Sequence, residues 1–186
     1  MENHSLQHIV LLTDCLENLM GGAEKQVFQL AQGLDKSRYH VTVVSLECEG
    51  EAPVKIFTSI GCDLKIFPVS RIYGFSGLRE GRQFLKFLKA ENVQLVLTYH
   101  FSSDIWGTFW AKKADVPVII SNRRDMGFWR DWKHILAYRW INRDVTKVIA
   151  VAKAVKEQIV YDEGVFPEKI AVIYNGVGPM DAQNPR

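Results

Sequence analysis

Short apolar runs alternate with amphipathic segments along the whole chain. Unbroken apolar runs are typical of buried strands, and here they predict seven strands, at 9–13, 41–46, 63–69, 93–98, 116–121, 145–151 and 169–174. Between the strands, apolar residues recur every three or four positions, as on one face of a helix. This spacing predicts helices at 23–34, 51–59, 77–91, 104–113, 131–142 and 152–162.

Capping and breaking residues agree with this alternation. Asp104 is a candidate N-cap for the helix that ends near 113, and Gly61 and Gly164 are candidate terminators of two others. Strands that alternate with helices form right-handed βαβ units, a parallel sheet and helices on both faces. The sequence therefore predicts an α/β, Rossmann-like domain over 8–174. The remainder, 175–186, begins with Asn175 and Gly176 and has the composition of a linker, which suggests half of a larger protein.

Composition and charge narrow the class of protein. The 186 residues are 47% apolar and 24% charged, as in an ordinary globular domain, and a net charge of +2 does not indicate nucleic acid as a partner. Cys15, Cys48 and Cys62 match no zinc spacing, so we expect reduced thiols and no metal. The N-terminal residues are polar, and no apolar run approaches the ~18 residues of a membrane span. These features predict a cytoplasmic protein.

The stretch HIVLLTDCLENLMGGAEKQVFQLAQGL reads as strand, loop and helix, with Gly21 and Gly22 just before the helix. Such a loop lies at the carboxyl edge of a parallel sheet, and a helix start presents free N–H groups to an anion. A phosphate-bearing ligand is the functional interpretation. The alternative is that the glycines only supply positive φ at a turn. Glu47, after the second strand, would suit a nicotinamide dinucleotide, but the G-x-G-x-x-G spacing is missing, and a P-loop is excluded.

Four motifs in order resemble one family. GGAEKQVFQLAQGL, TYHFSSDIWG, SNRRDMGFW and IYNGV are similar to segments in the N-terminal domain of family-four retaining glycosyltransferases of the GT-B type. The resemblance covers about 8–177. It departs from the family pattern at Ala152, where a serine usually precedes the helix, and at Gly178, where an aspartate commonly follows Asn-Gly-Val.

The resemblance implies a two-domain enzyme that moves a hexose from a nucleotide-sugar to a glycan or lipid-linked acceptor, with retention and without a metal or cofactor. The N-terminal half mainly holds the acceptor, and Gly21, Gly22 and Ala23 would border the donor diphosphate. The donor-binding C-terminal domain is absent from these residues and would be a partner. We therefore expect little or no transfer from this chain alone.

Candidate acceptor residues follow two other strands. His100 comes after the strand at 93–98, on the same edge as the glycines, and the resemblance implies contact with the transferred sugar or acceptor. The alternative is a half-buried histidine satisfied by backbone groups. Arg123 and Arg124 end the fifth strand and could reach a phosphate or carboxylate. We assign acceptor binding to both arginines and to Asn18 in the glycine-bearing loop.

The segment 123–143 is basic and rich in aromatic residues. It fits three interpretations: a solvated helix whose tryptophans cover a core edge, an acceptor site, or peripheral attachment to the anionic inner face of a membrane. Single-stranded nucleic acid also favours such surfaces, but no RNA-binding motif accompanies the segment. The sequence thus favours the acceptor half of a glycosyltransferase. The alternatives are a non-catalytic module that binds glycans or lipid-linked sugars and, on Glu47 alone, a NAD-dependent enzyme.

Overall fold

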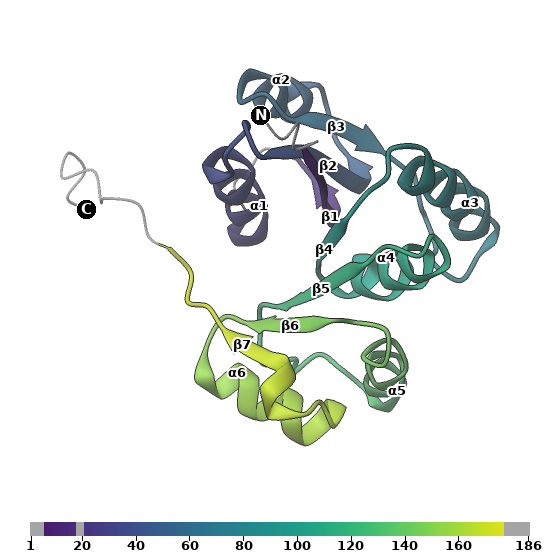
Figure 1. The fold of residues 1–186 in the computed structure, drawn as a ribbon. Coiled ribbons are helices and arrows are strands. Elements are labelled where there is room, and N and C mark those ends of the chain that lie inside the picture. The colour runs from purple at the N-terminus through teal and green to yellow at the C-terminus, as the bar shows by residue number, and fades with distance from the viewer. Residues whose placement is uncertain (1–5, 18–20, 177–186) are drawn as a thin grey trace.

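The computed structural model describes residues 6–17 and 21–176. Within them, seven parallel strands form one sheet in the order β3-β2-β1-β4-β5-β6-β7 (Figure 1). The strands are β1 (Gln7–Leu16), β2 (Tyr39–Cys48), β3 (Asp63–Ile66), β4 (Leu95–Tyr99), β5 (Val118–Arg123), β6 (Lys147–Ala150) and β7 (Ile170–Val172). The helices are α1 (Gly22–Gly33), α2 (Ala52–Ser59), α3 (Phe75–Ala90), α4 (Phe101–Lys113), α5 (Trp132–Ile141) and α6 (Lys153–Gln158), which continues as a π-helical turn (Ile159–Glu163). The predicted Rossmann-like fold is confirmed.

Two apolar clusters cover the two faces of the sheet, because successive strand residues point to opposite sides. Leu11 of β1 packs in a cluster with Val27 of α1. The next residue, Leu12, packs in the other cluster with Trp106 of α4. Figure 1 shows α1 and α2 on one side of the sheet and α3, α4 and α5 on the other.

The strand order creates a crevice at one position on the carboxyl edge. From β1 the chain winds outward to β2 and β3, and it then returns to place β4 on the other side of β1. The loops after β1 and β4 therefore lead to helices on opposite faces. In open α/β sheets, ligands bind at this kind of switch point.

The structure corrects the expected role of Asp104. Helix α4 begins at Phe101, with His100 at the N-cap position and no side-chain cap from it. Asp104 instead lies in the first turn and is fully buried, and its carboxylate accepts hydrogen bonds from Thr98 and from Arg123. Asp104 therefore forms a buried ion pair with β5 and does not cap the helix, although its place in the sequence is typical of an N-cap.

Gly81 lets α3 and α4 approach each other closely. A Cβ atom at this position would collide with the indole ring of Trp110, which is itself buried in the core. Forcing atoms into a packed interior costs about 1–3 kcal/mol. We expect Gly81→Ala to lower the free energy of unfolding by that amount, as measured by urea denaturation.

Gly33→Ala is the matched control, because a Cβ there would meet nothing within 4 Å. Alanine in a helix is favoured over glycine by roughly 0.5–1 kcal/mol, so this variant should be as stable as the parent or slightly more stable. Equal stability of Gly81→Ala and the parent would contradict the close helix contact.

Candidate functional site

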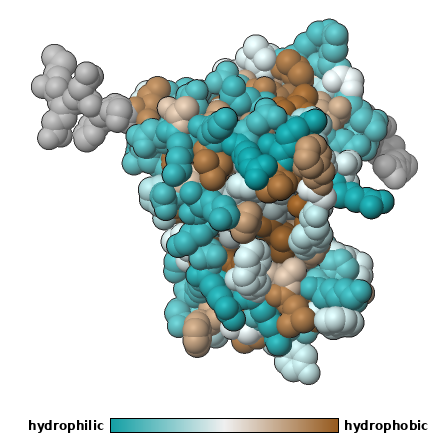
Figure 2. Space-filling view, turned by 90° about the vertical axis from the view of Figure 1, so that its right-hand side faces the viewer, coloured by the Kyte–Doolittle hydropathy of each residue, from teal (hydrophilic) through white to brown (hydrophobic). Residues whose placement is uncertain are grey.

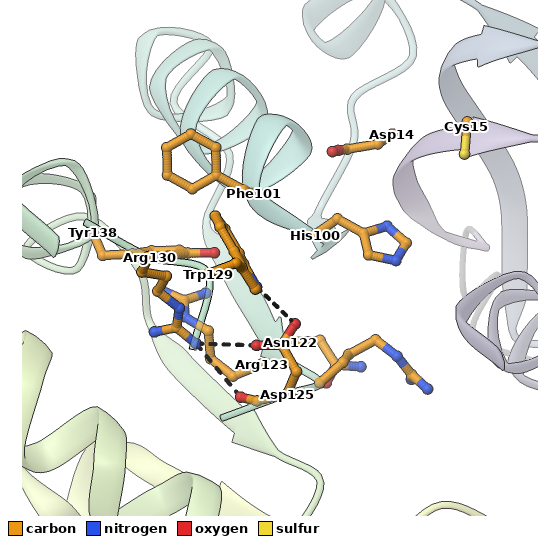
Figure 3. Close-up of a pocket in the computed structure, with 11 residues that line it drawn as sticks. Asp14, Cys15, His100, Phe101, Asn122, Arg123, Asp125, Trp129, Arg130 and Tyr138 are labelled. Atoms are coloured by element: carbon orange, nitrogen blue, oxygen red, sulfur yellow. Dashed lines mark hydrogen bonds and ion pairs between the residues drawn. The ribbon is translucent and has the colours of Figure 1, made fainter. Parts of the chain in front are cut away.

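The crevice at the carboxyl edge contains a cavity of about 380 Å³, with walls from the ends of β1, β4 and β5 and from the segment that leads into α5. Figure 3 shows His100 and Cys15 on one side of this cavity and the aromatic rings of Phe101 and Trp129 on the other. The cavity therefore combines hydrogen-bonding groups with apolar ring surfaces. This combination is typical of small-molecule sites.

His100 adopts a backbone conformation that is close to exclusive to glycine. Its φ is 74° and its ψ is 170°, a region in which a side chain costs about 1–3 kcal/mol. Its Nδ1 lies 3.5 Å from the hydroxyl oxygen of Thr13 in β1, and its ring lines the cavity. The backbone-satisfied histidine considered above is not what the structure contains, since the hydroxyl of Thr13 is its partner. Strain of this kind is characteristic of functional positions.

Two of the helices that start at this edge are closed by carboxylates. Asp14 accepts the backbone N–H groups of Ser102 and Ser103, at 3.1 and 2.6 Å, and so covers the first turn of α4. Asp131 caps α5 by accepting the N–H groups of Lys133 and His134. An anionic ligand would be repelled from both helix starts.

The start of α1 has no side-chain cap, as is also the case for α2, α3 and α6. Gly21 occupies the N-cap position with φ −67° and ψ 144°, and Gly22 has no positive φ either. The turn interpretation of these glycines is therefore wrong. A Cβ at Gly22 would meet nothing within 4 Å, so packing within the described chain does not require glycine there. The first-turn N–H groups, including that of Ala23, remain available to an anion.

Arg124 joins the end of β5 to this helix start. Its Nη2 donates to the backbone oxygen of Gly22 at 3.4 Å, and its Nη1 donates to the side chain of Gln26. Burial lowers the pKa of the Arg124 guanidinium from its usual value, but an arginine stays protonated at neutral pH. A fixed positive charge thus lies beside the uncapped end of α1.

Arg123 is among the residues that line the cavity, but its guanidinium is committed to partners within the protein, which corrects the acceptor-binding role expected for it. Its side chain is 1% exposed and forms ion pairs with Asp104 (Nη1–Oδ2, 2.7 Å) and with Glu163 (Nη2–Oε2, 3.1 Å). It also donates to Asn142, and its guanidinium lies 3.8 Å from the ring centroid of Tyr138. The reason is strand alternation: Arg123 and Arg124 point to opposite faces of the sheet.

The buried ion pairs extend to a second arginine. Nη1 of Arg130 lies 2.7 Å from Oε1 of Glu163. Burial by itself would raise the pKa of the Glu163 carboxyl, but the nearby charge of Arg123, its hydrogen bonds and Arg130 hold that pKa below its usual value. Arg130 comes from the segment that also carries Trp129, so this ionic cluster holds one wall of the cavity in place.

Asn122 is a site residue that the sequence analysis missed. It is buried, lines the 380 Å³ cavity, and its Oδ1 has no hydrogen-bond partner among the described residues. It also lines a second cavity of about 310 Å³, which includes Gln26, Asn175 and Gly176. The predicted linker start thus lies on the same edge as α1. The expected acceptor residue Asn18 lies outside the described residues.

The described residues contain no cluster of three or more histidine, cysteine or acidic side chains suited to a metal ion. Cys15, Cys48 and Cys62 form no disulfide with one another.

Comparison with known proteins gives one family and several similar folds. The model of Glycosyltransferase Family 4 matches residues 20–179. No curated protein sequence gives a significant match. Among solved structures, HepE of Anabaena in complex with UDP and glucose has a TM-score of 0.70 at 18% identity, over 90% of this chain and 44% of that one.

Two further structures have a similar fold. The lipopolysaccharide outer core galactosyltransferase WaaB has a TM-score of 0.68 at 17% identity, over 96% of this chain and 50% of that one. A glycosyltransferase from Rickettsia africae has a TM-score of 0.71 at 18% identity, over 92% and 44%. The chain therefore spans about half the length of these proteins.

Proposed function

The chain belongs to glycosyltransferase family 4, and from this premise we propose that it is the acceptor-side half of an enzyme that transfers a hexose from a nucleotide-sugar. The uncapped start of α1 beside Arg124 is the observation that carries the proposal. This helix start lies on an edge where α4 and α5 are capped by Asp14 and Asp131, and the guanidinium of Arg124 beside it counters the buried carboxylate of Glu24 in its first turn. A diphosphate is a ligand suited to this position.

The nucleotide-sugar class of donor is supported by the ligands of a structurally similar protein as well as by charge. Structures of HepE contain UDP or UDP-glucose. In the proposed enzyme the donor diphosphate lies against Gly21, Gly22 and Ala23, and a second domain holds the nucleotide. Because the donor needs contacts from both sides of the cleft, this half by itself should transfer little or nothing.

The acceptor and the transferred sugar are assigned to the 380 Å³ cavity. The imidazole of His100 and the unpartnered Oδ1 of Asn122 can hydrogen-bond sugar hydroxyls, since a buried polar atom without a partner favours a ligand that supplies one. The rings of Phe101 and Trp129 offer apolar surface to the faces of a pyranose. No residue of the cavity needs to act as a general base in this proposal.

The proposed chemistry retains the anomeric configuration. The acceptor oxygen bonds to the anomeric carbon on the face from which the diphosphate leaves, the bond from that carbon to the phosphate oxygen breaks, and the acceptor proton passes to the departing phosphate oxygen. Negative charge grows on the diphosphate as the bond breaks. The α1 dipole and Arg124 stabilise that charge, which is the larger part of what this chain contributes.

Gly22→Ala tests the proposal, because it separates folding from ligand binding. No described atom lies within 4 Å of the new Cβ, and alanine favours a helix, so the variant should fold at least as stably as the parent. We expect sugar transfer to fall roughly tenfold to a hundredfold, because the methyl group keeps the diphosphate from the first-turn N–H groups. The assay uses a two-domain protein in which this chain is fused to a donor-binding domain of the same fold. It measures sugar transfer from UDP- and GDP-sugars.

Gly33→Ala at the other end of α1 is the matched control and should transfer sugar at the parental rate. A folded two-domain protein that transfers no sugar would contradict the proposal. Titration of this chain with candidate acceptors then separates a binding module from an enzyme, since the module would bind a glycan without turnover.

A further inference from the structure

Large apolar side chains are exposed along one side of the molecule, at α3 and α5. Phe75 in the first turn of α3 is 79% exposed, and Trp132 in the first turn of α5 is 66% exposed. Others on or next to these helices are Tyr73, Leu78, Phe128, Leu136 and Trp140. Figure 2 views this side and shows hydrophobic side chains gathered between hydrophilic ones. Scattered single residues would need no explanation, but a gathered set indicates a contact surface.

A groove lies between the two helices, above α4. Its volume is about 480 Å³, and its lining includes Phe75 and Leu78 of α3, Phe109 and Trp110 of α4, and Trp140 of α5. The rings of Phe109 and Trp140 approach to 5.8 Å between centroids. This groove is separate from the proposed sugar site and is lined almost entirely by apolar and aromatic side chains. A hydrocarbon chain suits such a lining better than a sugar does.

The charges on the same helices have one sign. Every exposed charged side chain within α3, α4 and α5 is positive, and these are Arg79, Arg82, Lys86, Lys89, Lys112, Lys113, Lys133 and Arg139. The acidic residues of these helices, Glu80 and Asp104, are buried. Three of these charges are offset in part, because Glu80 lies 2.7 Å from Arg79, and Asp115 and Asp144 outside the helices lie 3.6 Å from Lys89 and Lys112.

The other side of the sheet has a different balance. The end of β2 and the loop from it into α2 expose Glu47, Glu49 and Glu51. With a net charge of only +2 for the whole chain, the positive charge of α3, α4 and α5 is a local feature. This face is therefore complementary to a negatively charged surface with an apolar interior.

We propose that the face formed by α3, α4 and α5 binds the surface of an anionic lipid bilayer. Exposed tryptophan, tyrosine and phenylalanine rings suit the headgroup level of a membrane, and lysine and arginine side chains are attracted to anionic headgroups. Phe75, Trp132 and Trp140 enter the headgroup layer, and the groove accepts an acyl chain. No helix among the described residues is long and apolar enough to cross a bilayer, so the contact is peripheral.

The proposed membrane-binding face is larger than the segment 123–143, which was the only part of the chain that the sequence indicated as a candidate for membrane attachment. Helix α3 supplies Phe75, Leu78 and exposed cations to the same face, although it ends 33 positions before that segment begins. Lipid binding does not depend on sugar transfer. It would nevertheless bring a lipid-linked acceptor near the carboxyl edge, where α3, α4 and α5 all begin.

Vesicle flotation tests the proposal with the full chain. We expect the chain to float with phosphatidylcholine vesicles that contain phosphatidylglycerol, to float far less with phosphatidylcholine alone, and to be released by added salt. Phe75→Ser with Trp140→Ser, and separately Arg79→Glu with Arg82→Glu, should each weaken binding roughly tenfold or more. Circular dichroism verifies that the variants fold.

Matched changes away from the face serve as controls. Tyr161→Ser removes an aromatic side chain that is 83% exposed beyond α6, and Lys55→Glu reverses an exposed charge on α2. Both should bind vesicles as the parent does. Equal binding to the two kinds of vesicle, or unchanged binding by both face variants, would overturn the proposal. So would dimers in sedimentation velocity that the serine variants abolish, because the face would then join two copies of the chain.

Discussion

Replacing Arg123 with methionine is expected to lower the free energy of unfolding by about 3–5 kcal/mol. The substitution keeps most of the side-chain volume but leaves Asp104 buried without its cation. Asp104 has no exposure, and only the weaker hydrogen bonds from Thr98, Ser121 and Tyr138 would remain to its carboxylate. Urea denaturation followed by tryptophan fluorescence measures the change.

The control for this variant is Arg82→Met, which removes an exposed arginine from α3 and should change stability by no more than about 0.5 kcal/mol. A second variant, Arg123→Met with Asp104→Asn, removes both charges and should recover part of the loss, since the two residues are in contact. If Arg123→Met is within about 1 kcal/mol of the parent, the cluster does not hold the wall of the cavity.

Replacing Arg124 with alanine is expected to lower sugar transfer roughly a hundredfold, the usual size of losing one charged donor from a preorganised site. The effect should appear in kcat and in kcat/KM together, because the charge on the leaving diphosphate develops in the transition state. The fold should be little affected, since Arg124 is half-buried and its partners are exposed or half-exposed. Transfer from a radiolabelled nucleotide-sugar, in the two-domain protein, measures the loss.

Lys55→Ala removes an equal charge from α2, at a residue that does not line the cavity. This variant should leave sugar transfer unchanged. Arg124→Lys keeps the charge but not the fork of donors that reaches both Gly22 and Gln26, so it should restore only part of the rate. If Arg124→Ala retains full activity, the donor diphosphate is not stabilised from β5.

The fold was predictable because the apolar runs, the helical spacing of apolar residues and the helix-ending glycines all indicated the same alternation of strands and helices. Seven apolar runs became seven strands, and the glycines at 61 and 164 terminate helices with φ of 70° and 65°. Element boundaries were less predictable. The first two strands extend well past the predicted runs, because the pairing of β1 with β2 continues into polar residues such as Gln7 and Glu47.

The site was predictable where its position follows from chain order alone. A parallel sheet brings the ends of β1, β4 and β5 to one edge, so the closeness of Gly22, His100 and Arg124 needed no side-chain information. The roles of Arg123 and Asp104 did need it. Period-two alternation shows that neighbouring arginines diverge, but it does not show that one of them meets a carboxylate from another helix.

Long-range partners left no local signal. Glu163 pairs with Arg123 across forty positions and with Arg130 across thirty-three, and Asp14 caps a helix that begins far along the chain. Asp14 and Glu163 look like ordinary surface acids in the sequence. Only the folded geometry separates a carboxylate that closes a helix from one that anchors the wall of a cavity.

The backbone at His100 has a consequence for how this protein can change over time. A glycine would relax the strain at φ 74° and ψ 170° and make the molecule more heat-resistant, at the cost of the imidazole. A laboratory selection that rewarded thermal endurance alone would therefore drift toward glycine at this position. Persistence of histidine there in such a selection would mean that glycine brings no gain in heat resistance at position 100, and that the backbone is not strained there.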